Sequence, residues 1–467
     1  MTRTAPDVIT SWVESHFDGS VTSITRQPRW RPVWWVEVDT AEGAKKLCVR
    51  GDRVDMSLIF PLAHEMALQD EMYRHGLPVP QVHGWIEDSS LDLRAYVMDF
   101  VPGDNDFVNC SDETREAIVD EYLHSLVTLH ALPVESFAAR GIMRASSPNE
   151  SGLLGMRQYE RNWRAMKKVP NPFLEFALAW LKRNPPQSRG RESVIVWDSG
   201  QFHHNGSHLT AILDVEIGHI GDPMMDLAAW RQRDTVIGYG DFERLYARYE
   251  QLSGNEVDLD ALMRHHFFFC LSNELSVGPA TRTPAPESDL MTNLQWCYET
   301  NLFATEALAD ILQVELPTVD VPTSHESRSE VVLDHLVRQL GSITVEDEFT
   351  RYQLRTMFRM ARHAKRLDEI GIDLSEQDLD DLTPLLGHRP DSWLEGESAL
   401  ERFVIANAAS SEFDVQLLHI FHKRHLRAQM TLGPAGSAMT RHAAIQRFTL
   451  RTPDSSSRRK SPTVAEG

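Results

Sequence analysis

The sequence has few cysteines and no long apolar run. Its only cysteines are Cys48, Cys110, Cys270 and Cys297. They are widely spaced and form no CxxC pair, so the pattern indicates neither a disulfide framework nor a zinc knuckle and favours a reducing cytoplasm. No uncharged stretch of about 18 apolar residues occurs. Asp7 and Glu14 interrupt the N-terminal stretch where a signal peptide needs apolar residues. We therefore expect a cytoplasmic protein without a membrane partner.

Basic residues are also in deficit. Lysine and arginine number 47 against 68 aspartates and glutamates, which gives a formal net charge of −21. A field of this sign disfavours broad contact with nucleic acid or an anionic membrane, but it leaves room for a local basic pocket that binds phosphate. The hydrophobic share of 42% is that of an ordinary globular protein, so a sizeable core is expected.

The distribution of apolar residues predicts four regions. Runs rich in β-branched and aromatic residues at 34–38, 46–50 and 95–100 predict strands, and helical spacing over 61–76 predicts a helix between the second and third. Helical patterns dominate from about residue 114. We therefore predict an N-terminal region at 1–102, a helical region at 103–320 and a further helical region at 325–450. The polar tail at 451–467 is expected to be disordered.

Acidic residues are concentrated around two short β-rich runs, 194–198 and 209–216, which we predict to be neighbouring antiparallel strands. Asp198 ends the first run and Asp214 lies near the end of the second. A buried carboxylate is costly unless it binds a metal, a donor or a proton. If the strands pair, one carboxylate can accept a hydroxyl proton while the other holds a divalent ion. Phosphoryl transfer requires this arrangement.

At this point the sequence resembles the aminoglycoside phosphotransferases and related small-molecule kinases. The segments ILDVE (212–216), GDPMMDLAAW (221–230) and LHALP (129–133) carry the resemblance in the helical region. In the N-terminal region LCVRG (47–51), the helix-containing segment at 64–84 and YVMDFVPG (96–103) are similar to the same family. The resemblance covers residues 20 to 310, approximately, and leaves the region after 325 without a counterpart.

The resemblance implies an α+β, bilobal protein-kinase-like fold, with a small antiparallel-sheet lobe, a mainly helical lobe and an extra C-terminal helical region. It implies magnesium as cofactor, ATP or GTP as co-substrate, and a small-molecule hydroxyl acceptor. The site residues that it implies are catalytic Asp198, metal-binding Asp214 and Gln201, phosphate-binding Arg50 paired with Glu65, and the adenine-binding hinge Met98, Asp99 and Phe100.

Three departures from the family pattern affect these roles. Val196 and Trp197 replace the His-Gly that precedes the catalytic aspartate. The metal-binding asparagine is missing, because position 203 is histidine; Gln201 is chosen because its amide oxygen can ligate a hard cation. The glycine-rich phosphate loop is replaced by RQPRWRPVWWVEV at 26–38. In this segment Arg29 and Arg31 are alternative hydrogen-bond donors to the phosphates.

We therefore predict transfer of the γ-phosphoryl group of ATP or GTP to an unidentified small molecule, for which the acidic balance favours a cationic aminosugar. The alternative is a nucleotide-binding pseudokinase with a regulatory or scaffolding role. A third possibility is a metal hydrolase built around Asp214, Glu216 and His219. Three purely structural interpretations accompany these. Arg50 and Glu65 can be a surface ion pair, Asp222 and Asp226 can cap and brace the next helix, and the histidines at 203–204 can be exposed turn residues.

Overall fold

The computed structural model describes residues 3–29, 31–53, 58–187, 190–286, 288–432 and 443–448. The predicted disordered tail at 451–467 lies outside these residues. No helix in the described ranges is long and apolar enough to cross a bilayer.

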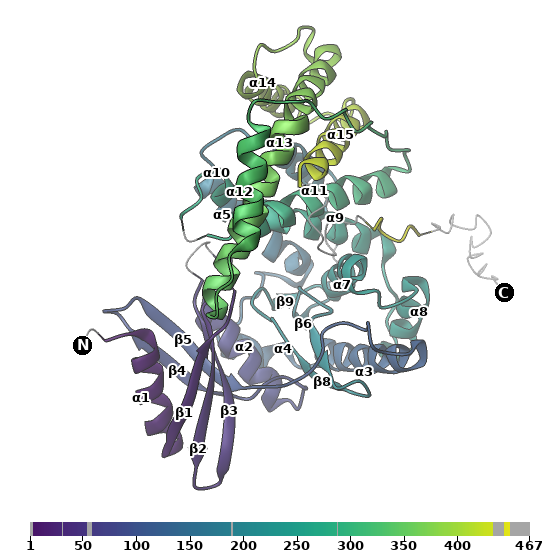
Figure 1. Cartoon of the computed structure of the whole chain (residues 1–467). Helices are drawn as coiled ribbons and strands as arrows, with labels where there is room; N and C mark the ends of the chain where they lie inside the picture. Colours follow the sequence, from purple (N-terminus) through teal and green to yellow (C-terminus); the bar gives the residue numbers. More distant parts are fainter. Residues whose placement is uncertain are drawn as a thin grey trace, which may run out of the picture.

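The N-terminal part is an antiparallel sheet with a helix on each face (Figure 1). The strands lie in the order β1-β2-β3-β5-β4. The elements are α1 (Ala5–Phe17), β1 (Gly19–Arg26), β2 (Val33–Thr40), β3 (Gly43–Gly51), α2 (Leu62–Arg74), β4 (Val82–Asp88) and β5 (Leu93–Asp99). The strands and the helix expected in this region are confirmed, whereas α1 has no counterpart among our predictions.

Strict alternation along the strands separates the two faces of the sheet. In β3, Leu47 and Val49 point into an apolar core shared with α1, and in β5 Val97 does the same. Arg50, the residue after Val49, lies opposite Tyr96 on the neighbouring strand, so both side chains face the other way. The pleat of the sheet thereby delivers Arg50 to the face that is covered by α2.

The rest of the described chain is mainly helical. Its helices are α3 (Asp112–Ala131), α4 (Val134–Ala139), the 3-10 helix η1 (Pro148–Leu153), α5 (Leu154–Met166), α6 (Pro172–Arg183), α7 (Pro223–Ile237), α8 (Phe242–Ser253), α9 (Leu259–Ser276), α10 (Gly278–Arg282), α11 (Leu290–Leu312), α12 (Glu330–Ser342), α13 (Glu348–Leu386), α14 (Trp393–Ala406) and α15 (Asp414–Leu432). The predicted boundary near residue 103 falls between the end of β5 and the start of α3. The expected fold class, a small antiparallel sheet followed by a mainly helical part, is confirmed.

Four short strands lie between α6 and α7, and their pairing differs from the prediction. They are β6 (Ser193–Ile195), β7 (Phe202–His204), β8 (Leu209–Ile212) and β9 (His219–Gly221). The predicted pairing of 194–198 with 209–216 is wrong, because β6 pairs with β9 and β7 pairs with β8. Asp198 and Asp214 both lie in the connections that follow these strands.

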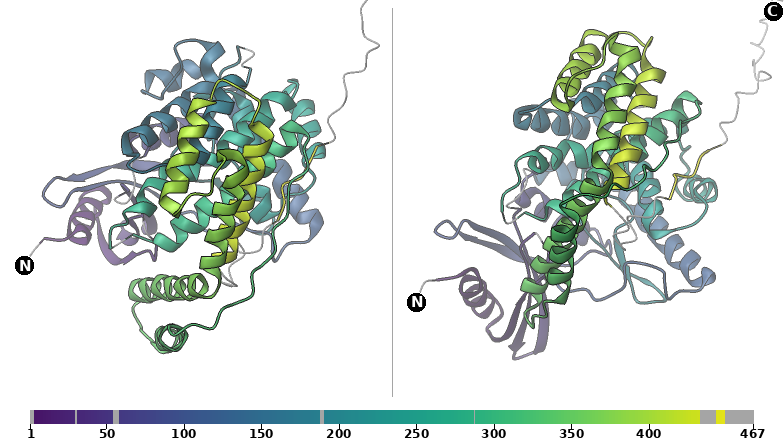
Figure 2. Two further views of the ribbon diagram at one scale, coloured as in Figure 1. Left: turned by 90° about the horizontal axis from the view of Figure 1, so that it is seen from above. Right: turned by 45° about the horizontal axis from the view of Figure 1, so that its top comes forward.

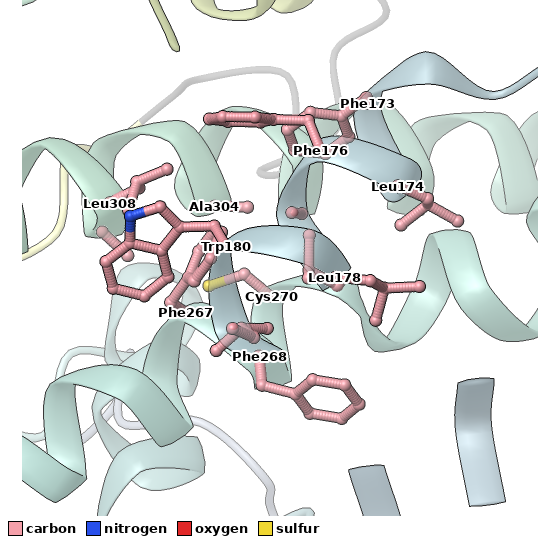
Figure 3. Close-up of a cluster of buried hydrophobic side chains, with 14 of the residues drawn as sticks. Phe173, Leu174, Phe176, Leu178, Trp180, Phe267, Phe268, Cys270, Ala304 and Leu308 are labelled. Atoms are coloured by element: carbon pink, nitrogen blue, oxygen red, sulfur yellow. The ribbon is translucent and has the colours of Figure 1, made fainter. Parts of the chain in front are cut away.

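The helical part contains two large apolar clusters, and Figure 3 shows residues of one of them. Helix α6 contributes Phe173, Phe176 and Trp180, which pack against residues of α9 and α11. Leu400 of α14 and Phe421 of α15 belong to the same cluster. Helices α13, α14 and α15 therefore share the core of the preceding region, whereas α12 contributes no buried residue. The 39-residue helix α13 runs from these C-terminal helices to the sheet (Figure 2).

Candidate active site

A cleft of about 480 Å³ lies between the sheet and the helical part. Of the residues predicted to form the site, its lining includes Arg50, Glu65, Met98, Asp99, Phe100, Gln201 and Asp214. Asp198 borders the cleft through hydrogen bonds to Gln201 and to Arg233, two residues of the lining. Trp35 of the segment at 26–38, which replaces the glycine-rich loop, forms part of the wall.

Arg50 and Glu65 form a buried ion pair at the inner end of the cleft. Arg50 Nε lies 2.6 Å from Glu65 Oε1, and their side chains are 10% and 2% exposed. The Tyr96 hydroxyl donates to the same carboxylate oxygen over 3.1 Å. Burial disfavours the charged form of both side chains, but the neighbouring opposite charges outweigh this effect. Glu65 raises the pKa of Arg50, and Arg31 together with Arg50 lowers the pKa of Glu65 below its ordinary value. The alternative of a surface pair is therefore wrong.

Arg31 lies inside this ion-pair network. Its Nη2 is 2.8 Å from Glu65 Oε2 and its Nη1 is 2.5 Å from Glu216 Oε2. Arg53 pairs with the other oxygen of Glu216, also at 2.5 Å. The prediction that Arg31 binds phosphate therefore conflicts with its position, because its N–H groups bind the carboxylates of Glu65 and Glu216. Arg29, the other alternative, is exposed and lines the cleft.

Asp214 follows β8 in the left-handed backbone region, with φ 57°. A short polar side chain tolerates this conformation better than a bulky one. Its carboxylate forms an ion pair with Arg50 Nη2. Burial opposes ionisation of Asp214, but Arg50 and Arg31 outweigh it and hold its pKa far below the usual value. Asp214 is therefore ionised at neutral pH.

Asp198 has two partners, one at each carboxylate oxygen. Gln201 Nε2 donates to Oδ2 over 2.5 Å, and Arg233 forms an ion pair with Oδ1. Because the amide nitrogen of Gln201 is used in this way, its amide oxygen is the atom left for a cation. Burial raises the pKa of Asp198; Arg233 opposes this rise and the charge of Asp214 adds to it. The two aspartates therefore interact electrostatically, as convergence on one cleft requires.

Asp226 supports the loop that carries Asp198. Its Oδ1 accepts from the N–H of Trp197 over 2.6 Å, and its Oδ2 accepts from Val196 N–H over 3.2 Å. Asp222 caps α7 by accepting from Met224 N–H over 2.9 Å. The structural roles expected for both aspartates hold, although Asp226 braces the preceding loop as well as belonging to the helix.

The two histidines after Gln201 are not exposed turn residues, so this prediction is wrong. His204 is 1% exposed and donates through Nε2 to the carbonyl of Asp106 over 2.6 Å. His203 lies partly buried on β7, with Nδ1 3.0 Å from the carbonyl of Val101. Both therefore tie the hairpin to the segment that follows β5. The Asn205-Gly206 pair, a common hairpin turn, was the signal that places them on a strand.

The predicted hinge lies at the end of β5. The N–H of Asp99 donates to Gln81 O over 3.0 Å, and that of Phe100 donates to Lys46 O over 3.2 Å. These two donors are used within the sheet, so an adenine could bind them only by displacing those bonds. The ring of Phe100 meets that of Trp35 edge-on at 5.2 Å. Next to this segment, Trp35 and Phe100 give the cleft an apolar aromatic wall.

The hydrolase centre is not assembled. No group of three or more histidine, cysteine, aspartate or glutamate side chains is arranged to hold a metal within the described ranges. Glu216 is engaged by arginines, and His219 Nδ1 lies 3.0 Å from the carbonyl of Ile217. Burial lowers the pKa of His219 to about 4.

Comparison with known proteins supports the family resemblance. The model of the phosphotransferase enzyme family matches residues 38–262. The resemblance predicted from the sequence is thus confirmed over these residues.

Two curated relatives and two solved structures illustrate the range of similarity. The Homo sapiens protein named acyl-CoA dehydrogenase family member 11 is 28% identical over 184 residues, which are 36% of this chain and 23% of that protein. The Mus musculus family member 10 is 26% identical over 188 residues, 36% of this chain and 17% of its own length. The aligned part is thus less than a quarter of either relative.

Among solved structures, a thermostable mutant of aminoglycoside phosphotransferase APH(4)-Ia, in complex with ADP and hygromycin B, is 16% identical with a TM-score of 0.42. It covers 57% of this chain and 91% of its own. Macrolide 2'-phosphotransferase MphH from Brachybacterium faecium is 19% identical with a TM-score of 0.41, covering 60% and 94%.

Proposed function

We propose that the protein is a small-molecule kinase that transfers the γ-phosphoryl group of ATP or GTP to a hydroxyl group. The match to the phosphotransferase enzyme family over residues 38–262 supports a phosphotransferase in general terms. The observation that carries the finer proposal is the meeting of Arg50, Asp214 and Gln201 in one cleft, beside Asp198. Cationic clamps, oxygen ligands for a metal and one carboxylate for the nucleophile are the groups that this reaction needs.

The nucleotide phosphates would lie along the Arg50 side of the cleft. Arg50 is held by Glu65, so its guanidinium is fixed before the nucleotide arrives. The ionised carboxylate of Asp214 and the amide oxygen of Gln201 are hard oxygen donors, which suit Mg²⁺. When bound, magnesium would supply positive charge that offsets the phosphate oxygens. Arg29, on the exposed wall, is placed to add a second cation.

Asp198 would orient the acceptor and take its proton. In the proposed step the acceptor oxygen forms a bond to the γ-phosphorus, and the bond from that phosphorus to the β-phosphate oxygen breaks. The hydroxyl proton passes to Asp198 and the nucleoside diphosphate leaves. A pKa raised by burial makes Asp198 a better proton acceptor than an exposed aspartate.

The test is transfer of label from γ-³²P-ATP or γ-³²P-GTP to a broad panel of hydroxyl compounds, with and without magnesium. We expect transfer that requires magnesium and that falls at least 1,000-fold in Asp198→Asn, while that variant keeps its nucleotide affinity. No transfer to any compound by wild type would count against the kinase. Asp260→Asn, an exposed aspartate of α9, is the matched control.

The pseudokinase remains a second candidate because both aspartates have arginine partners, Asp198 in Arg233 and Asp214 in Arg50. In a pseudokinase these ion pairs would persist when nucleotide binds. Magnesium-dependent nucleotide binding that survives Asp198→Ala, without transfer by wild type, would favour this candidate. Thermal shift with each nucleotide, with and without magnesium, measures the binding.

A further inference from the structure

Arg233 is a cation of α7 that lies beside Asp198 and belongs to no family motif in the sequence analysis. Its Nη2 forms an ion pair with Asp198 Oδ1, and the residue lines the cleft. Its aliphatic stem passes over Gly200, where an added Cβ would lie 3.3 Å from Arg233 Cδ. The absence of a side chain at Gly200 thus lets the guanidinium reach the carboxylate.

The guanidinium of Arg233 has donors that the protein leaves unused. Its Nε is buried and has no hydrogen-bond partner within the described part of the chain. The side chain as a whole is 28% exposed, towards the cleft. A guanidinium presents five N–H donors in a planar fork that matches an oxyanion. An incoming oxyanion could therefore bind it.

The charges around the cleft do not suit a cationic acceptor. The charged residues of the lining are Arg29, Arg50, Glu65, Asp99, Asp214 and Arg233. Each of these three acids already has a basic partner: Glu65 and Asp214 pair with Arg50, and Asp99 pairs with His83. An ammonium group near Asp198 would meet the charge of Arg233. Asp198 likewise pairs with Arg233, so none of these described carboxylates is without a basic partner for the aminosugar that the net charge of the whole chain favoured.

We propose that Arg233 binds the acceptor, and that the acceptor is a hydroxyl compound carrying an oxyanion, a carboxylate or a phosphate, close to the reacting hydroxyl. This proposal rests on the proposed kinase function. The oxyanion takes the N–H donors that now serve Asp198. Asp198 is thereby freed to accept the hydroxyl proton, so only an acceptor with the matching charge activates the base.

The test uses acceptors that share one carbon skeleton and differ in charge: glycerate, glycerol 3-phosphate, glycerol and 3-amino-1,2-propanediol. We expect wild type to phosphorylate one or both anionic compounds at least 10-fold more efficiently, in kcat/KM, than glycerol and to reject the amine. The two anionic arms distinguish a carboxylate from a phosphate.

Substitutions of Arg233 then separate recognition from structure. Arg233→Gln should raise KM for the anionic acceptor at least 10-fold and remove the preference over glycerol. Arg233→Lys should keep part of it, and Arg233→Glu should reverse it in favour of the amine. Arg248→Gln, which removes a half-buried arginine of α8 that pairs with Asp120 of α3, should change nothing. A loss that is equal for all four acceptors would overturn the proposal.

Binding separates failure of this proposal from failure of the kinase function. If wild type transfers phosphate to none of the four compounds, their affinity for the protein with magnesium and a non-hydrolysable ATP analogue is measured by calorimetry. Tighter binding of glycerate or glycerol 3-phosphate than of glycerol, lost in Arg233→Gln, supports the assignment without turnover. Equal affinities, or no binding of either anion, overturn it. Transfer without charge preference overturns it while leaving the kinase function intact.

Discussion

Arg50 and Asp214 lie 164 positions apart in the chain and form a direct ion pair across the cleft. Arg50 belongs to the sheet and Asp214 to the helical part, so the pair joins the two walls. Glu65 binds the same guanidinium through Nε. A nucleotide phosphate would be attracted to Arg50 and a metal ion to Asp214. A change at this pair should therefore affect both ligand binding and stability.

Removing Arg50 should therefore destabilise the fold as well as weaken nucleotide binding. In Arg50→Ala, Glu65 keeps only Arg31 and the Tyr96 hydroxyl, and breaking a buried pair costs about 3–5 kcal/mol. Urea unfolding should show this loss. Arg50→Lys should lose less stability but still bind nucleotide more weakly, because an ammonium cannot bridge two carboxylates as a guanidinium does. Unchanged stability in Arg50→Ala would contradict the network.

The control is Arg94→Ala, which removes a cation of the neighbouring strand that pairs with Asp52. Arg94 is 51% exposed, so its loss should leave stability nearly unchanged.

Buried histidines should make stability depend on pH. Burial lowers the pKa of both His64 and His219 from 6.5 to about 4. The unfolded chain therefore binds more protons than the folded one between these values. Stability should be fully present above pH 6.5 and fall as pH drops towards 4. His64 also accepts from Met143 N–H, which requires a neutral ring.

Unfolding free energies of wild type and His64→Gln at pH 5 and pH 7.5 isolate this contribution. The variant should lose up to about 2 kcal/mol less stability than wild type on acidification. The change in unfolding free energy between the two pH values is compared for wild type and variant. Titration of the carboxylates cancels in this comparison, because both proteins have the same carboxylates. Parallel pH profiles would show that His64 does not titrate in this way.

The sequence predicted the sheet well, for identifiable reasons. Strands of seven to nine residues have enough alternation to mark their faces, so Arg50 could be placed on β3. The three-residue strands β6, β7 and β9 are too short to specify a partner. Their pairing is determined by tertiary contacts, which is why the pairing of 194–198 with 209–216 was wrong.

Long-range ion pairs were the part of the site that the sequence could not reveal. Arg31 and Glu216 are separated by 185 positions. Arg233 reaches Asp198 from α7, a helix to which the sequence analysis assigned no site residue. Nothing in local periodicity says which carboxylate an arginine meets. Only the folded arrangement shows that Arg31 is structural and that Arg233 faces the cleft.

Phe349, at the start of α13, should affect nucleotide binding from outside the cleft. The Arg26 guanidinium lies 5.3 Å from the ring centroids of both Trp34 and Phe349, and it donates to Arg31 O over 3.0 Å. It thereby holds the turn between β1 and β2 that lines the cleft.

Phe349→Ala removes one of these two rings, at a cost of about 0.5–1 kcal/mol for a cation–π contact. We expect nucleotide affinity to fall roughly 2–5-fold by titration calorimetry. Met357→Ala, an exposed residue two turns along α13, should leave the affinity unchanged. Equal affinities in the two variants would mean that the turn is held without α13.

The segment at 443–448 should influence turnover through the turn between α7 and α8. Gln446 donates to Asp234 over 2.7 Å and to Gly240 O over 2.8 Å, and it accepts from Phe242 N–H over 3.1 Å. Within that turn, the Tyr239 hydroxyl donates to Gly200 O over 2.6 Å. Gly200 lies in the loop that carries Asp198, so the segment and the proposed base are joined by one chain of hydrogen bonds.

Gln446→Ala removes three of these hydrogen bonds and should lower kcat several-fold while nucleotide affinity stays constant, because Arg50 and the hinge are untouched. Arg447→Ala, an exposed neighbour in the same segment, is the control and should retain full turnover. Steady-state transfer assays and calorimetry on both variants measure the two quantities. If Gln446→Ala weakened nucleotide binding and left kcat intact, the segment would act on the sheet side of the cleft and not on the loop of Asp198.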